Sequence, residues 1–159
     1  MLDRMTQKNG SDRVQAIQAR LERVGRAHGI QFAFDGKTGN TRDSHRLIEL
    51  AGTKGANVQT ALVAELFAAH FERAGDITSR DELIWAGSTA GLEESEMLKY
   101  LQDDSTGREV DHKAEEARAS GISSVPTFEI QGRRIQGAED PSEFYQTFVA
   151  RKEGLQSNR

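Results

Sequence analysis

The apolar residues from position 11 to position 119 recur at helical spacing. In Ser11–His28 they stand three or four residues apart, at Val14, Ile17, Leu21 and Val24, while charged residues fill the other faces. This pattern predicts an amphipathic helix with Ser11 as its N-cap. The same periodicity predicts further helices that begin close to Thr41, Asn57, Ser79, Leu92 and Ser105.

The period of the apolar residues changes after Gly121. Residues Thr127–Ile130 alternate between apolar and polar side chains, which predicts a strand, and Gln131-Gly132 suits a two-residue turn. Residues Arg133–Gln136 are the returning strand. A helix then starts at Pro141, with Asp140 as its capping carboxylate and proline at the first helical position. The sequence therefore predicts a C-terminal β-hairpin followed by a helix.

Composition narrows the function classes. The chain has 159 residues, a formal net charge of −4 and no cysteine, so it offers no disulfide framework, thiolate nucleophile or thiolate metal site. Its charges are interspersed, which argues against a nucleic-acid surface. No apolar run approaches the ~18 residues that span a bilayer, and the first residues lack the apolar core of a signal peptide. We expect a cytoplasmic protein without nucleic-acid or membrane partners and without a cofactor.

The histidines do not form a catalytic or metal-binding pattern. His45 lies two residues after Asp43 in a predicted helix, and residues at that spacing do not face each other. His70 falls on the apolar face of another predicted helix. No two histidines have the His-x-x-x-His spacing of a metal site. We therefore expect packing or capping roles for these residues and no metal.

Two segments carry a family resemblance. "GISSVPTFEIQGRRIQGAEDPSEF" resembles the C-terminal half of a thioredoxin fold in the DsbA-like family, and "GKTGNTRDSHRLIELA" resembles the start of the helical insertion in its FrnE-like branch. The resemblance implies an α/β, thioredoxin-like fold of the DsbA type that is mostly helical, with a large helical insertion and a residual C-terminal β-hairpin plus helix. It assigns residues 11–119 to the helical region and residues 121–150 to the C-terminal thioredoxin-like half.

The resemblance also implies an activity and a binding site. Members of the family are thiol–disulfide oxidoreductases that act on a small thiol or an extended peptide. The site is a loop in which Val125 and Pro126 are joined by a cis peptide, and its backbone pairs with the substrate. The corner at Ala138 and Asp140, where a helix begins, holds the γ-glutamyl carboxylate of glutathione in relatives that bind it. For this chain, the substrate-binding residues implied are Val125, Pro126, Ala138 and Asp140.

The chain departs from the family at its N-terminus. The family begins with a strand, a Cys-x-x-Cys loop, a helix and a second strand, whereas ten residues that read as a loop or a helix end precede Ser11. Without a cysteine we expect this chain to lack catalysis. A fragment, a truncated gene product, an incomplete gene model and a diverged protein all remain open. Two alternatives to the oxidoreductase also remain: a non-catalytic module that binds a peptide or glutathione at the Val-Pro loop, and a helical interaction domain.

The absence of the first strand leaves one edge of the predicted strand Thr127–Ile130 without a partner. Unpaired backbone groups and the side chains of Phe128 and Ile130 would then be exposed. Three outcomes would relieve this exposure: the segment Gln31–Phe34 adds as a strand, two chains pair edge to edge as a homodimer, or the hairpin frays. We favour the homodimer, because Glu129 is the only charge in this strand.

Overall fold

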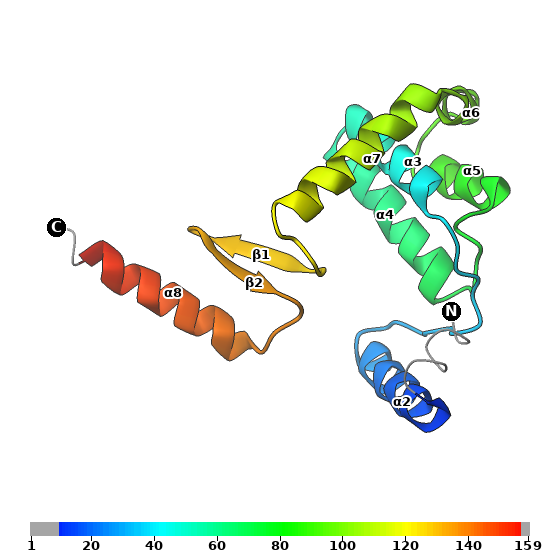
Figure 1. Cartoon of the computed structure of the whole chain (residues 1–159). Coiled ribbons are helices and arrows are strands. Elements are labelled where there is room, and N and C mark those ends of the chain that lie inside the picture. Colours follow the sequence, from blue (N-terminus) through cyan, green and yellow to red (C-terminus); the bar gives the residue numbers. More distant parts are fainter. Residues whose placement is uncertain (1–9, 157–159) are drawn as a thin grey trace. The chain divides into compact units, whose positions relative to one another are not determined.

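A computed structural model describes residues 10–156, which form seven helices and two strands (Figure 1). In chain order the elements are α2 (Ser11–Ala27), α3 (Arg42–Lys54), α4 (Ala56–Phe71), α5 (Arg80–Thr89), α6 (Glu94–Gln102), α7 (Asp104–Ala119), β1 (Thr127–Ile130), β2 (Arg133–Gln136) and α8 (Pro141–Gln156). The chain is mostly helical with one C-terminal hairpin, as the sequence predicted. Among the described residues, no helix is both long and apolar enough to cross a bilayer.

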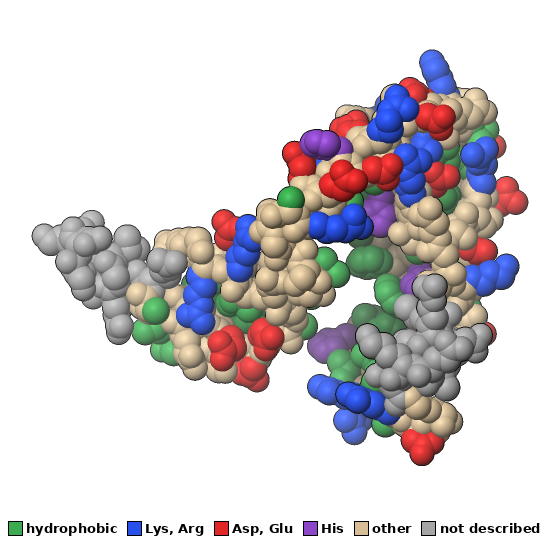
Figure 2. All heavy atoms as spheres, in the orientation of Figure 1, with side chains coloured by type: hydrophobic (Ala, Val, Ile, Leu, Met, Phe, Trp, Pro, Cys, Tyr) green, Lys and Arg blue, Asp and Glu red, His purple; other side chains and the backbone are tan. Residues whose placement is uncertain are grey.

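The chain divides into two compact units. The first, here called the helical unit, comprises residues 1–111, and the second, the hairpin unit, comprises residues 112–159. The division falls inside α7, earlier than the change of sequence period at Gly121. On the visible face of the helical unit, acidic and basic side chains lie interspersed (Figure 2).

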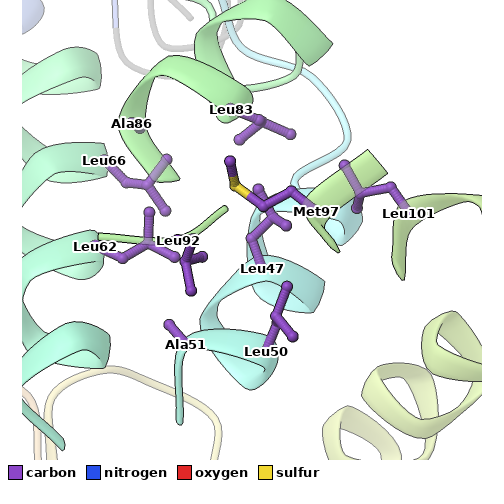
Figure 3. Packing of buried hydrophobic residues seen from close by; sticks show 10 residues of the cluster. All are labelled: Leu47, Leu50, Ala51, Leu62, Leu66, Leu83, Ala86, Leu92, Met97 and Leu101. Carbon is purple, nitrogen blue, oxygen red and sulfur yellow. The ribbon is translucent and has the colours of Figure 1, made fainter. Parts of the chain in front are cut away.

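The helical unit has one main hydrophobic core. Helices α3, α4, α5 and α6 pack against one another and enclose a cluster of buried side chains (Figure 3). The cluster comprises Leu47, Leu50, Ala51, Leu62, Leu66, Leu83, Ala86, Leu92, Met97 and Leu101. Nine of these residues come from the four helices and Leu92 comes from the connection between α5 and α6, so burying them together stabilises the unit.

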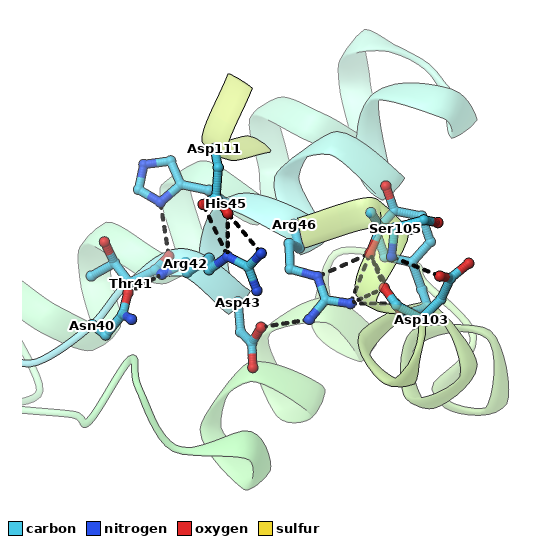
Figure 4. Close-up of polar contacts among 11 residues, drawn as sticks. Asn40, Thr41, Arg42, Asp43, His45, Arg46, Asp103, Ser105 and Asp111 are labelled. Atoms are coloured by element: carbon cyan, nitrogen blue, oxygen red, sulfur yellow. Dashed lines mark hydrogen bonds and ion pairs between the residues drawn. The ribbon is translucent and has the colours of Figure 1, made fainter. Parts of the chain in front are cut away.

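A buried arginine joins α3 to the start of α7 (Figure 4). The side chain of Arg46 is 4% exposed and its guanidinium donates to the carbonyls of Tyr100 and Asp103, each at 2.7 Å. It also donates to the hydroxyl of Thr106 and to the carboxylate of Asp43. All of these acceptors surround a charge that would otherwise be costly to bury.

A second arginine makes a more exposed contact between the same helices. The guanidinium of Arg42 donates to both carboxylate oxygens of Asp111, with the shortest N–O distance at 2.7 Å (Figure 4). This hydrogen bond raises the pKa of Arg42 and lowers the pKa of Asp111. Two arginines one turn apart on α3 therefore fix α7 in different ways, one buried and one at the surface.

The structure differs from the sequence prediction at the cap of the first helix, and it excludes one of the three outcomes considered for the edge of β1. Gly10, not Ser11, is the N-cap of α2, and the hydroxyl of Ser11 donates to Asp12 instead of capping the backbone. The segment 31–34 forms no strand; the N–H of Ala33 donates to the carbonyl of Phe71, at the end of α4, at 2.7 Å. The residues before Gly10, which read as a loop or a helix end, lie outside the described residues.

Candidate functional site

The loop before the hairpin begins where α7 ends. The N–H of Gly121 donates to the carbonyl of Arg118, and the N–H of Ile122 donates to that of Ala117. Gly121 has a φ of +83°, a conformation that favours glycine, and the two bonds are those of a Schellman helix end. Gly121 and these two hydrogen bonds together determine where α7 ends.

The side chain of Gln136, on β2, ties this loop to the hairpin. Its Oε1 accepts a hydrogen bond from the hydroxyl of Ser123 at 2.7 Å and from the N–H of Ser123 at 3.3 Å. The hydroxyl of Ser124 also donates to Oε1, and the Nε2 of Gln136 donates to the carbonyl of Gly121. One amide therefore accepts from and donates to residues on the N-terminal side of Val125.

The loop presents Val125 to solvent. Val125 is 88% exposed, and its backbone N–H and C=O bond to none of the described residues. The peptide bond between Val125 and Pro126 is cis. The residues on either side are held, because the hydroxyl of Thr127 donates to the carbonyl of Ser124 at 2.6 Å and the N–H of Gly137 donates to the carbonyl of Pro126 at 2.8 Å. A free backbone segment thus stands between two fixed points.

The hairpin has the strands and turn that the sequence predicted. β1 and β2 pair antiparallel, with Phe128 opposite Ile135 and Ile130 opposite Arg133. Gln131 and Gly132 both have positive φ, as a two-residue hairpin turn of type I′ requires. Helix α8 packs mainly on β2, where Ile135 is buried, and the ring of Phe144 meets the edge of Phe128 at a centroid distance of 4.9 Å.

The carboxylate of Asp140 lies at the N-terminus of α8. The N–H of Ser142 donates to the carboxylate of Asp140 at 2.9 Å. Hydrogen bonding to the side chain of Ser142, and after it to this backbone N–H, lowers the pKa of Asp140. Asp140 is therefore the helix cap that the sequence predicted, and it takes up one of the N–H groups that an external carboxylate would use. Ala138 is exposed beside it.

Neither histidine considered from the sequence forms a catalytic pair. The Nδ1 of His45 lies 2.8 Å from the carbonyl of Thr41, while the carboxylate of Asp43 accepts from Arg46 (Figure 4). The ring of His70 packs against Phe71 at a centroid distance of 4.7 Å. In the part of the chain that the structure describes, no group of acidic or histidine side chains has the arrangement of a metal site.

A second feature lies in the helical unit and was missed from the sequence. It is an apolar cavity of about 660 Å³ between α2, the segment 31–34 and α4. Leu21, Phe32, Phe67 and Phe71 line it, and Phe32 and Phe71 meet edge to face. The sequence signal was present in the apolar residues of these segments, but their convergence depends on tertiary structure.

Comparisons with known proteins agree with this geometry. The model of the DSBA-like thioredoxin domain family matches residues 2–149. The chain belongs to the DSBA-like thioredoxin domain family. A crystal structure of a probable DsbA oxidoreductase from Streptomyces coelicolor is similar to this chain, with a TM-score of 0.75 and 26% sequence identity. The similarity covers 92% of this chain and 64% of that protein. No protein of curated function matches the chain.

The family assignment confirms the predicted fold class. The chain is a DsbA-like thioredoxin fold that is mostly helical, and its described residues hold one small antiparallel sheet of two strands. In this DsbA-like domain the exposed Val125 loop, the hairpin and α8 form a single compact unit. Gln136, which holds the loop, was not identified from the sequence, because a single glutamine in a strand carries no local signal.

Proposed function

We propose that this chain is an FrnE-like member of the family and supplies the substrate-binding part of a thiol–disulfide oxidoreductase. The observation that carries the proposal is the Val125 loop. Its backbone N–H and C=O are free among the described residues, and hydrogen bonds hold the chain on both sides. A backbone segment with a free donor and acceptor of this kind suits pairing with an extended peptide.

The chemistry of the family sets the limits of this role. Thiol–disulfide exchange begins when a thiolate attacks a disulfide sulfur. None of the 159 residues is a cysteine, so these residues contribute binding and not the nucleophile. For the family's reaction the thiolate has to come from residues outside this sequence, and the proposal assigns to this chain the task of orienting the substrate backbone.

The peptide is a better candidate for the substrate than glutathione. The carboxylate of Asp140 already accepts the N–H of Ser142, so a second carboxylate at this corner would meet like charge. The loop at Val125, by contrast, carries no charge and offers both a donor and an acceptor. The proposed binding of an extended peptide therefore uses the Val125 loop and does not require the helix N-terminus at Asp140.

Replacing Gln136 with alanine should weaken binding of an extended peptide by about 3- to 10-fold. The substitution removes the hydrogen bonds to Gly121, Ser123 and Ser124, so peptide binding must order a looser loop. Fluorescence anisotropy of a labelled, extended peptide with one S-methylcysteine measures the effect on the full chain.

Gln146→Ala is the matched control. Gln146 is exposed on α8 in the same unit, and the same atoms are removed, so binding should not change. Amide exchange of β1 and β2 in the Gln136→Ala variant shows whether the hairpin remains folded. Equal affinity of the Gln136→Ala and unmodified chains, with the hairpin intact, would contradict the role of the loop.

A further inference from the structure

Strand β2 presents its side chains to two different faces of the hairpin. Because side chains alternate along a strand, Arg133 and Ile135 lie on one face. Ile135 is buried where α8 packs on β2, and Arg133 pairs with Glu143 of α8 at 3.9 Å. Arg134 and Gln136 lie on the opposite face, turned away from α8. This second face is the one from which Gln136 holds the loop before the hairpin.

The guanidinium of Arg134 lies against the end of α7. Its Nη1 donates to the carbonyl of Ser120, the residue that follows α7, and a Cβ added at Gly121 would lie 3.6 Å from the same nitrogen. Its Nε donates to the carboxylate of Glu129 at 3.1 Å, and Glu129 is the cross-strand partner of Arg134. One planar group therefore connects both strands of the hairpin to the end of α7.

A positive charge in this place suits the C-terminus of a helix. The last carbonyls of a helix have no N–H partner within it, and they carry a partial negative charge that a cation stabilises. The ion pair with Glu129 is itself worth little, because 36% of the Arg134 side chain and 60% of the Glu129 side chain are exposed. Its effect is to direct the guanidinium toward Ser120.

We propose that Arg134 is a positioning residue for the Val125 loop. Arg134 fixes the carbonyl of Ser120, where the loop begins, and Gln136 fixes the hydroxyl of Ser124 from the same face of β2. The backbone is then held at two points before it reaches the exposed Val125. The inference rests on the proposed function, because the position of Val125 matters for binding only if its backbone pairs with a peptide.

Two adjacent arginines provide a matched pair of variants. Arg134→Ala and Arg133→Ala remove the same atoms from neighbouring positions of β2, and each breaks one ion pair at the surface. In the peptide-free full chain, the amides of Ile122 and Ser123 should exchange about 2- to 10-fold faster in Arg134→Ala than in Arg133→Ala. These amides donate to the carbonyl of Ala117 and to Gln136, so they report the order of the loop.

The amide of Ile135 shows whether the hairpin itself is affected. Ile135 lies opposite Phe128 in the ladder, and its amide exchange should be the same in both variants. Equal exchange of the loop amides in Arg134→Ala and Arg133→Ala would overturn the positioning role. Faster exchange at Ile135 in Arg134→Ala would mean that Arg134 stabilises the whole hairpin, and it would overturn a role confined to the loop.

Peptide affinity provides a second readout, by fluorescence anisotropy with the S-methylcysteine peptide. Arg134→Ala should bind the peptide about 3- to 10-fold more weakly than Arg133→Ala, because binding must then order a looser loop. Arg134→Lys should recover part of the loss, since it keeps a cation at the end of α7 but lacks the planar fork. An Arg134→Lys variant that binds no better than Arg134→Ala would contradict the role of this charge.

A double-mutant cycle tests whether Arg134 and Gln136 act on one loop. If they do, either variant leaves less order for the other to remove. The combined variant should then bind the peptide at least roughly 2-fold more tightly than the product of the two single effects predicts. Effects that simply multiply would show that the two residues act independently and would overturn the shared role. If the unmodified chain binds no peptide, the proposed function fails, and the exchange rates of the free chain still decide the role of Arg134.

Discussion

Replacing Leu47 with alanine is expected to lower the free energy of unfolding of the helical unit by about 2–5 kcal/mol. Leu47 is fully buried, and it contributes to the core cluster with Leu62, Leu83 and Met97 (Figure 3). Removing three heavy atoms from this core loses their transfer free energy and leaves a cavity. Urea unfolding, followed by the fluorescence of Trp85 on α5, measures the loss.

Leu21→Ala is the control for this prediction. Leu21 lies on α2 of the same unit and is 41% exposed, so the same change should cost less than about 1 kcal/mol. Leu47→Ala and Leu21→Ala with the same unfolding midpoint would mean that the cluster around Leu47 does not form the core of the unit.

Replacing Arg46 with alanine should destabilise the helical unit by about 2–4 kcal/mol. The change removes the guanidinium that donates to the carbonyls of Tyr100 and Asp103. It also leaves a gap between α3 and the start of α7. The loss comes mainly from these buried contacts, because the ion pair with Asp43 is partly exposed. The same unfolding measurement applies.

Two variants separate the buried contacts of Arg46 from its charge. Arg42→Ala removes the ion pair with Asp111, whose side chains are 33% and 51% exposed, and should cost less than about 1 kcal/mol. Arg46→Lys keeps the charge but lacks the planar fork that reaches several acceptors at once, so it should retain only part of the stability. Similar losses for Arg42→Ala and Arg46→Ala would contradict a special role of the buried guanidinium.

The hairpin unit was the most predictable part of the fold. The bounds of β1 and β2 and the start of α8 at Pro141 follow from local signals: alternation of apolar residues, glycine in the turn and Asp140 at the cap. The cap of α2 was less predictable. Gly10 and Ser11 are both acceptable caps, and the choice between them does not depend on a strong local interaction.

The candidate site was predictable only in part. The family resemblance identified the loop of Val125 and Pro126, but it did not identify Gln136, which holds the loop through hydrogen bonds to residues 12 to 15 positions away. The buried Arg46 was missed for a similar reason. The carbonyls that accept from it lie more than 50 positions along the chain, and an arginine in an amphipathic helix usually faces solvent.

Chemical-shift mapping of the isotope-labelled chain with the S-methylcysteine peptide tests the central claim most directly. The titration is run at one fixed concentration of the chain, so that only peptide binding changes the spectrum. We expect the amide shifts of Ser124, Val125 and Thr127 to move with peptide concentration, while residues that line the apolar cavity, such as Phe67 and Phe71, keep their shifts. Shifts confined to the cavity, or no shift at the solubility limit of the peptide, would contradict the assignment of substrate binding to the Val125 loop.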